Sequence, residues 1–271
     1  MPTHTDRAGV ERALLSLRPV LAASGIALGL ADGPGRPLGP GERELVSAVP
    51  APRRRDFLAG RLAARRALRA VGLPAGEILA DGRRPVFPEG SVGSISHSGG
   101  LAVALAAPAA RFRALGCDLE LRGLPVEAAH LVLSEDERVW MAGSWRRLLF
   151  AFSAKETAFK ALGDDAPSNL LGIALRRRDG FHAWPRDVPG RVLVVRTHDV
   201  AGAAFTWTSS PAPPLPETGG ASPPDPPGAQ IQPVRRLRTS GAAALGVRGL
   251  PGFGKGRGRG NKPAGPHPGT G

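Results

Sequence analysis

The sequence predicts a mixed α/β fold that is followed by a C-terminal tail without stable structure. Apolar segments of helical and of extended type alternate along residues 1–210. Hydrophobic residues make up 42% of the 271 residues, which is enough for a sizeable core. After Ser210 the composition changes sharply, and proline and glycine dominate 211–271. We expect this last segment to be disordered, because it cannot bury enough surface to offset its ordering entropy.

Helices are expected where apolar residues recur at helical spacing and where glycine or proline marks the ends. Their predicted ranges are 42–49, 53–71, 125–133, 135–142 and 145–162. Strands are expected at short apolar runs bounded by turn residues. Their predicted ranges are 92–97, 101–107, 112–121, 172–177, 191–197 and 203–208. The helix predicted last carries an apolar stripe that should face the core, comprising Leu148, Phe152, Phe159 and Leu162.

The chain is basic, with a formal charge of +13. Residues 211–271 hold eight Lys or Arg and two Asp or Glu, so the rest of the chain is basic as well. This charge favours anionic partners such as nucleotides, nucleic acid or an acidic protein, although a compositional bias toward arginine would produce the same charge. The single cysteine, Cys117, cannot form an internal disulfide, and no segment is apolar enough to span a membrane. We therefore expect a cytoplasmic protein.

Two carboxylates stand two residues apart on the predicted strand 112–121. Asp118 and Glu120 should point to the same face of that strand, where their charges repel each other unless a cation lies between them. Hard oxygen ligands of this kind favour Mg²⁺. The alternative is a solvated strand end, with Cys117 and Leu119 facing the core.

The segment Phe152–Lys160 adds a third carboxylate, Glu156, and two lysines, Lys155 and Lys160. Together with the acidic pair upstream, these groups suggest a metal site with a general base and with cations for an anionic substrate. Two simpler explanations exist. Ser153 and Glu156 match a helix capping box, and Glu156 and Lys160 match an ion pair between residues four apart on a helix.

Two further groups suit a phosphate. His97 closes the predicted strand 92–97 before a glycine-rich turn, where backbone N–H groups and an imidazole can meet a phosphate. A histidine at a strand end is nevertheless more often structural. On the predicted helix 53–71, Arg53, Arg54 and Arg61 recur on about one face, and guanidinium groups bind phosphate well. A solvated basic face is the alternative for these arginines.

Taken in order, these residues resemble the 4′-phosphopantetheinyl transferase family. The likeness is to the monomeric, two-lobed type that primes carrier proteins of siderophore, polyketide and nonribosomal peptide pathways. It covers about residues 10–208 and rests on five segments, Arg53–Arg61, Gly82–Pro88, Gly93–Ser98, Gly116–Glu120 and Phe152–Lys160. The resemblance implies transfer of the 4′-phosphopantetheine group of coenzyme A to a serine of an apo-carrier protein, with release of 3′,5′-ADP.

The resemblance also implies a role for each site residue. Asp118, Glu120 and Glu156 would hold Mg²⁺, and Glu156 would also take the proton of the carrier serine. Lys160 would neutralise or protonate the leaving 3′,5′-ADP, and Lys155 would contact the pyrophosphate. The residues expected to bind coenzyme A are Arg53, Arg61, Arg83, Arg84, Ser96, His97, Asp118, Lys155 and Lys160.

The fold implied by the resemblance consists of two similar α/β lobes, here 1–109 and 110–210, related by a pseudo-twofold axis, with the active site in the cleft between them. The tail 211–271 has no counterpart in the family. A lysine expected near Ala80 is absent, which leaves open whether Arg83 or Arg84 contacts phosphate.

The alternative function is nucleic-acid binding through the Arg53–Arg66 helix and the Gly-Arg repeats of the tail. That alternative leaves the spacing of the acidic residues unexplained, so nucleic acid is not the expected partner.

Overall fold

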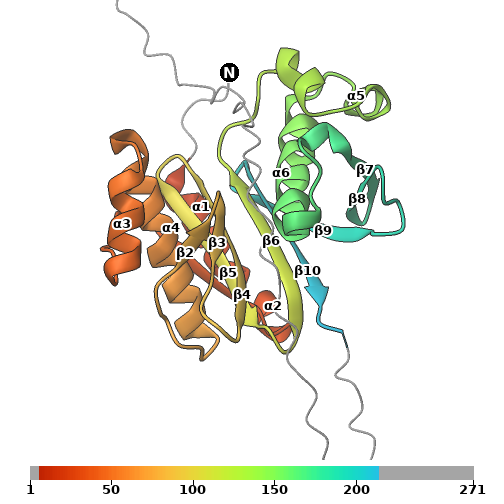
Figure 1. Cartoon of the computed structure of the whole chain (residues 1–271). Coiled ribbons are helices and arrows are strands. Elements are labelled where there is room, and N and C mark those ends of the chain that lie inside the picture. The colour runs from red at the N-terminus through yellow and green to blue at the C-terminus, as the bar shows by residue number, and fades with distance from the viewer. Residues whose placement is uncertain (1–5, 214–271) are drawn as a thin grey trace, which may run out of the picture. The chain divides into compact units, whose positions relative to one another are not determined.

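Helices and antiparallel strands alternate in the computed structural model of the chain, which describes residues 6–213 (Figure 1). The helices are α1 (Arg7–Ser16), α2 (Arg18–Ala23), α3 (Pro40–Ala48), α4 (Ala51–Ala70), α5 (Glu135–Met141) and α6 (Trp145–Leu162). The strands are β1 (Ala27–Ala31), β2 (Leu79–Asp81), β3 (Arg84–Val86), β4 (Ser91–Ser98), β5 (Leu101–Pro108), β6 (Phe112–Glu120), β7 (Ile173–Arg178), β8 (Gly180–Pro185), β9 (Leu193–Val200) and β10 (Ala203–Pro211). Pro211, predicted to be the first residue of the disordered tail, is instead the last residue of β10, and the tail from residue 214 on lies outside the described residues.

The strands form two main antiparallel sheets, so the fold is a mixed α+β fold. The first sheet has the order β1-β5-β4 and the second the order β6-β10-β9-β8-β7, while β2 and β3 form a separate hairpin. Each sheet is covered on one face by a long helix, α4 on the first sheet and α6 on the second (Figure 1). Among residues 6–213, no helix is both long and apolar enough to cross a membrane.

One hydrophobic core is shared by the two sheets. It contains Val10 of α1 and Val103 of β5 together with Leu119 of β6 and Phe205 of β10. Because alternate residues of a strand point to opposite faces, the other face of β5 is free to pack against α4, and it does so mainly through small alanine side chains. A separate core lies between α6 and the strands β7, β8 and β9.

Most of the predicted elements between residues 42 and 208 are confirmed within a few residues, and α6 covers the predicted range 145–162. The segment predicted as a helix at 125–133 forms only a short 3₁₀ helix, η1 (Val126–Leu131). The sequence did not predict α1, α2, β1, β2, β3 or β8. Five of these elements have six residues or fewer, too few for a period to emerge from the apolar pattern.

The capping box that was the simpler alternative for Ser153 and Glu156 does not form, because both residues lie inside α6. Ser153 is buried there, and its hydroxyl group is hydrogen-bonded to Thr206 of β10. A capping box does occur in the chain, at Ser134 and Glu137, where it starts α5.

A glycine in each sheet lets a helix backbone approach closely. A Cβ atom added to Gly29 of β1 would lie 2.0 Å from the carbonyl oxygen of Ala63 in α4. A Cβ atom added to Gly116 of β6 would lie 2.2 Å from the carbonyl oxygen of Thr157 in α6. Since real Cβ atoms do not approach backbone this closely, any larger residue would push the helix away from its sheet.

Each long helix also carries a buried ion pair with the helix before it. Arg65 of α4 contacts Glu42 of α3 at 2.7 Å, and Lys155 of α6 contacts Glu137 of α5 at 2.7 Å. In both pairs the carboxylate also accepts a hydrogen bond from the backbone N–H of a residue after the long helix, Ile78 in one case and Leu175 in the other. Burial of these charges is tolerated because each is paired and hydrogen-bonded.

The glycine contacts predict that Gly29→Ala and Gly116→Ala each lower the free energy of unfolding by about 1–3 kcal/mol, as expected for overpacking. Gly33→Ala is the matched control, since nothing lies within 4 Å of an added Cβ there. Denaturant titration of the three variants checks this. Equal stabilities for all three would contradict the close helix–sheet contacts.

The buried pair on α6 predicts that Lys155→Met destabilises the protein by about 1–3 kcal/mol, because Glu137 would lose its buried ammonium partner and keep only the partly exposed Arg186 and the N–H of Leu175. The double variant Glu137→Gln/Lys155→Met should recover part of this loss, since it removes both charges. Thermal and denaturant unfolding measure the effect. A Lys155→Met variant as stable as the unaltered chain would show that the ammonium does not occupy this buried position.

Candidate active site

Three serines of β4 join the two sheets. Strands β4 and β6 run side by side, and the hydroxyl oxygens of Ser94, Ser96 and Ser98 accept hydrogen bonds of 3.0, 3.2 and 3.1 Å from backbone N–H groups of Cys117, Leu119 and Leu121. The three serines are two residues apart and therefore point to the same side of β4. We call this row of contacts the serine ladder. It satisfies the N–H groups along the edge of β6 with side chains.

The acids of β6 are held by the same serines. The hydroxyl group of Ser96 donates to Asp118 Oδ1 at 2.9 Å, and that of Ser98 lies 3.4 Å from Glu120 Oε2. Because the Ser96 oxygen already accepts the N–H of Leu119, its single proton is available for Asp118. Ser96, predicted to bind a cofactor, thus positions an acid in this structure.

Lys160 reaches the same acid from α6. Its Nζ atom donates to Asp118 Oδ1 at 2.6 Å and to the carbonyl oxygen of Cys117 at 3.1 Å. Asp118 is buried, whereas the Lys160 side chain keeps about a quarter of its exposure, 26%. Burial alone would lower the pKa of Lys160, but the charges of Asp118 and Glu156 outweigh it and leave the pKa raised. The ammonium group therefore stays charged.

The other two carboxylates show the effect of crowded negative charge. Burial raises the pKa of Glu120 to about 8, and the neighbouring charge of Asp118 adds to the rise. Burial also raises the pKa of Glu156, an effect that Lys160 opposes. Asp118 Oδ2 is buried and has no hydrogen-bond partner among residues 6–213. An additional cation at this position would satisfy the free oxygen and lower the pKa values of its neighbours.

The residues present fit a divalent cation that takes only some of its ligands from the protein. In the part of the chain that the structure describes, no three His, Cys, Asp or Glu side chains are grouped so that they could hold an ion by themselves. The expected site of Asp118, Glu120 and Glu156 is therefore not preformed, and its assignment stays a prediction. Mg²⁺ usually binds one or two carboxylates and completes its shell with water and substrate phosphate. Asp118 and Glu120 suit such a partial shell.

His97 lies at the end of β4, within electrostatic reach of this group. Burial lowers its pKa, Asp56 and Asp118 oppose this effect, and Lys160 and Arg53 add to it. The Nδ1 atom of His97 lies 3.8 Å from Asp56 Oδ2 of α4. Asp56 was not among the residues predicted for the site, although it stands three residues after Arg53 and so on a neighbouring position of the same helix face. The structure thus brings His97 and Arg53 toward the cluster of Asp118, Glu120, Glu156 and Lys160.

Lys155 and Arg61, predicted to contact phosphates, are not brought to this cluster. The ammonium group of Lys155 is fully buried against Glu137. Arg61 is also buried, its guanidinium group donates to the carbonyl oxygens of Ile78 and Leu79, and burial lowers its pKa to about 10. Their contacts with coenzyme A stay predictions that these positions do not favour.

The two arginines of the β2–β3 hairpin differ from each other. Arg83 is exposed in the turn. Arg84 forms ion pairs with Asp81 at 3.1 Å and with Asp164, just after α6, at 2.9 Å. Arg84 therefore links the hairpin to the end of the helix that carries Lys160. Which of the two arginines contacts phosphate is not decided by these positions.

The arginine-rich helix α4 does not present one open basic face. Arg61 and Arg65 are buried, and Arg66 donates to the carbonyl oxygen of Leu30 at 2.6 Å. Arg54, in the first turns, donates to the carbonyl oxygen of Val49. The part of the nucleic-acid hypothesis that depends on Arg53–Arg66 therefore loses several of its contacts. The Gly-Arg repeats lie outside the described residues.

Comparison with known proteins relates the sequence to one enzyme family. The family described as the 4′-phosphopantetheinyl transferase N-terminal domain matches residues 41–107. The 4′-phosphopantetheinyl transferase Svp of Streptomyces mobaraensis is 41% identical over 214 residues, which cover 66% of this chain and 85% of Svp.

Two further relatives match over shorter segments. The 4′-phosphopantetheinyl transferase Npt of Nocardia iowensis is 38% identical over 130 residues, 45% of this chain and 57% of Npt. Enterobactin synthase component D of Salmonella typhi is 37% identical over 119 residues, 41% of this chain and 49% of that protein. With the likeness to Svp extending over most of that enzyme, the chain belongs to the 4′-phosphopantetheinyl transferase family and is an enzyme of this class.

Proposed function

We propose that the cluster around Asp118 binds coenzyme A and transfers its 4′-phosphopantetheine group to a serine of an apo-carrier protein. The buried, unpartnered oxygen of Asp118 next to the charged Lys160 carries this proposal. It gives the site one open position for a cation and one fixed positive charge, which is what the diphosphate of coenzyme A requires.

In the proposed reaction, the serine oxygen of the carrier forms a bond to the phosphorus atom that bears the pantetheine arm. The bond from that phosphorus to the bridging oxygen breaks, and its electron pair leaves with 3′,5′-ADP. Glu156 is the candidate base for the serine proton, directly or through a water molecule. Its raised pKa lies closer to neutral pH, which favours general-base catalysis. When bound, Mg²⁺ would neutralise charge on the diphosphate.

Lys160 is suited to stabilise the leaving group. Its raised pKa makes it a poor proton donor, so neutralising the negative charge on 3′,5′-ADP is the better role for it. Asp118, Glu120 and Glu156 are the candidate metal ligands. His97 and Arg53 are the candidates for the nucleotide phosphates, because both lie on the side of the cluster toward α4. One chain supplies all of these groups, which agrees with the expected monomer.

We also propose that 1–109 and 110–210 are related lobes, as the sequence analysis expected. Both contain a strand, a long helix with a shorter helix before it, and two hairpins, and in both the first strand pairs with the last. The matching glycine contacts of Gly29 and Gly116, and the two matching buried ion pairs, support this relationship. The proposed boundary falls between β5 and β6, beside the serine ladder.

The proposed function predicts that the chain, incubated with coenzyme A, Mg²⁺ and an apo-carrier domain, adds one phosphopantetheine group, detected by intact mass. Asp118→Asn should reduce kcat/KM by about a hundred- to a thousandfold, the usual loss when electrostatic stabilisation of the transition state is weakened. Chelation of divalent cations with EDTA should abolish transfer, and Mg²⁺ should restore it.

Asp187→Asn is the matched control for this substitution, since Asp187 is an exposed acid outside the cluster. If a folded Asp118→Asn variant retains transfer, the assignment of Asp118 to the active site is wrong. Failure of the unaltered chain with every carrier tested would oppose the function itself.

The serine ladder predicts that Ser96→Ala lowers kcat/KM by about tenfold or more. The variant loses the hydroxyl group that donates to Asp118 and leaves the N–H of Leu119 without its partner. Ser91→Ala is the control on the same strand, because the Ser91 hydroxyl group bonds only to the carbonyl oxygen of Pro88 among the described residues. Similar activity in both variants would mean that the ladder does not position Asp118.

A further inference from the structure

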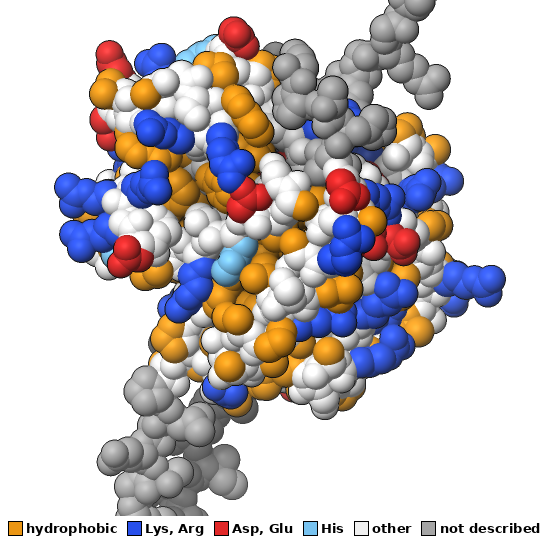
Figure 2. All heavy atoms as spheres, turned by 180° about the vertical axis from the view of Figure 1, so that it is seen from behind, with side chains coloured by type: hydrophobic (Ala, Val, Ile, Leu, Met, Phe, Trp, Pro, Cys, Tyr) orange, Lys and Arg blue, Asp and Glu red, His pale blue; other side chains and the backbone are white. Residues whose placement is uncertain are grey.

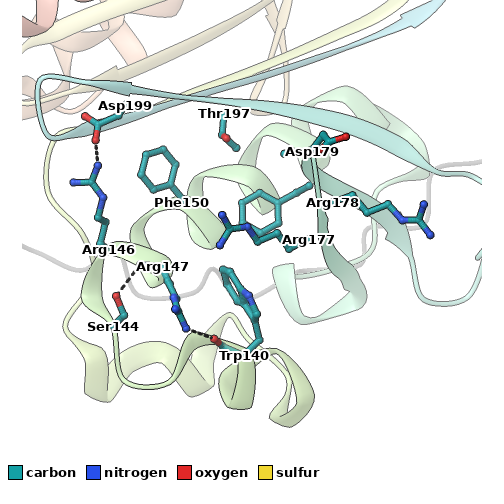
Figure 3. Close-up of a pocket in the computed structure, with 12 residues that line it drawn as sticks. Trp140, Ser144, Arg146, Arg147, Phe150, Arg177, Arg178, Asp179, Thr197 and Asp199 are labelled. Atoms are coloured by element: carbon teal, nitrogen blue, oxygen red, sulfur yellow. Dashed lines mark hydrogen bonds and ion pairs between the residues drawn. The ribbon is translucent and has the colours of Figure 1, made fainter.

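A groove lined by arginines and aromatic rings lies in the second half of the chain, between α5, the start of α6 and the strands β7, β8 and β9 (Figure 3). Its volume is about 600 Å³. We call it the basic groove and define it by six of its lining residues, Trp140, Arg146, Arg147, Phe150, Arg177 and Arg178.

The basic groove keeps an excess of positive charge. It is lined by four arginines and two acids, Asp179 and Asp199. Arg146 is neutralised by its ion pair with Asp199 (Figure 3). Arg147 donates to the carbonyl oxygen of Trp140 at 3.0 Å, a contact that leaves its charge uncompensated.

The remaining positive charges of the basic groove lie on β7, an edge strand, which Asp179 follows directly. Arg177 and Arg178 are exposed there. Arg147 and Arg177 both lie 5.9 Å from the Trp140 ring and converge on it from different elements (Figure 3). The partly exposed indole is thus flanked by two guanidinium groups.

Basic side chains are common on the face of the protein that Figure 2 shows, so positive charge alone does not mark a site. The basic groove differs because its arginines surround partly exposed aromatic rings. Arginine and tryptophan are the residues that most often dominate the energy of protein–protein interfaces. An acidic protein segment fits this surface, since carboxylates can pair with the free guanidinium groups while apolar side chains cover Trp140.

The basic groove starts close to the proposed catalytic cluster. Asp199 of β9 is paired with Ala204 of β10, which is paired with Glu120 of β6. Residues paired in this way point to the same face of a sheet. With neighbouring strands about 4.8 Å apart, the backbone at Asp199 lies about 10 Å from that at Glu120. A protein bound in the groove could therefore place a serine from a nearby loop at the cluster.

We propose that the basic groove is the docking surface for the carrier protein and that it selects carriers with an acidic segment next to the acceptor serine. This inference rests on the proposed function, because the docked protein is the acceptor in that reaction. It adds a specificity determinant to the chain. Arg147, Arg177 and Arg178 act on acceptor binding and not on the chemistry at Asp118.

The test measures transfer by the full chain to an apo-carrier domain that has Asp or Glu residues next to its acceptor serine. The variant is Arg177→Glu/Arg178→Glu. The matched control is Arg69→Glu/Arg138→Glu, which changes the net charge equally at exposed positions outside the groove. We expect the groove variant to lower kcat/KM for the carrier by about tenfold or more, while KM for coenzyme A and the thermal unfolding midpoint stay unchanged.

A carrier whose acidic residues are changed to Lys gives a second arm. It should be a poor acceptor for the unaltered chain and a better one for the groove variant, and raised salt should reduce the preference of the unaltered chain for the acidic carrier. If the unaltered chain is active but the groove and control variants behave alike, the docking proposal is overturned and the transferase function stands. Loss of RNA binding in the groove variant without any change in carrier kinetics would also overturn it. Inactivity of the unaltered chain would instead oppose the proposed function.

Discussion

The serine ladder between β4 and β6 is the contact on which the arrangement of the active site depends. The hydroxyl groups of Ser94, Ser96 and Ser98 connect one sheet to the edge of the other, where a backbone strand pairing would otherwise be needed. The serine ladder serves two purposes, because a hydroxyl group can accept from a backbone N–H and donate to a carboxylate at the same time. It therefore joins the two sheets and at the same time fixes Asp118 where Lys160 can reach it.

The remaining structure holds the two partners of the ladder in place. Each sheet is pressed against its own long helix at a glycine, and each long helix is tied to its preceding helix by a buried ion pair. This repetition gives Lys155 a structural role on α6, while Lys160, five residues later, carries the charge at the site. Two lysines of one motif thus serve different purposes, because the helix turns them toward different elements.

The sequence predicts the strong periodic elements and the chemistry of the acidic motifs, because both depend on local spacing. Asp118 and Glu120 were expected on one face of a strand, and both are held there by serines of β4. The partners of these residues could not be predicted in the same way. Glu137 becomes the partner of Lys155 only through the packing of α5 on α6. The guanidinium group of Arg61 donates to the carbonyl oxygens of Ile78 and Leu79, which follow α4 in the chain. The alternation of serines in Ser94–Ser98 is visible in the sequence, but their role as hydrogen-bond partners of β6 could not be predicted without knowing that β6 lies beside β4.

Binding of Mn²⁺ in place of Mg²⁺ tests the central claim most directly, since its anomalous scattering locates the ion in crystals grown with coenzyme A. We expect one anomalous peak within coordination distance of Asp118 Oδ2, next to the diphosphate and on the side away from Lys160. A peak that lies on the diphosphate but is bound by other residues, with Asp118 Oδ2 still without a partner, would contradict the account.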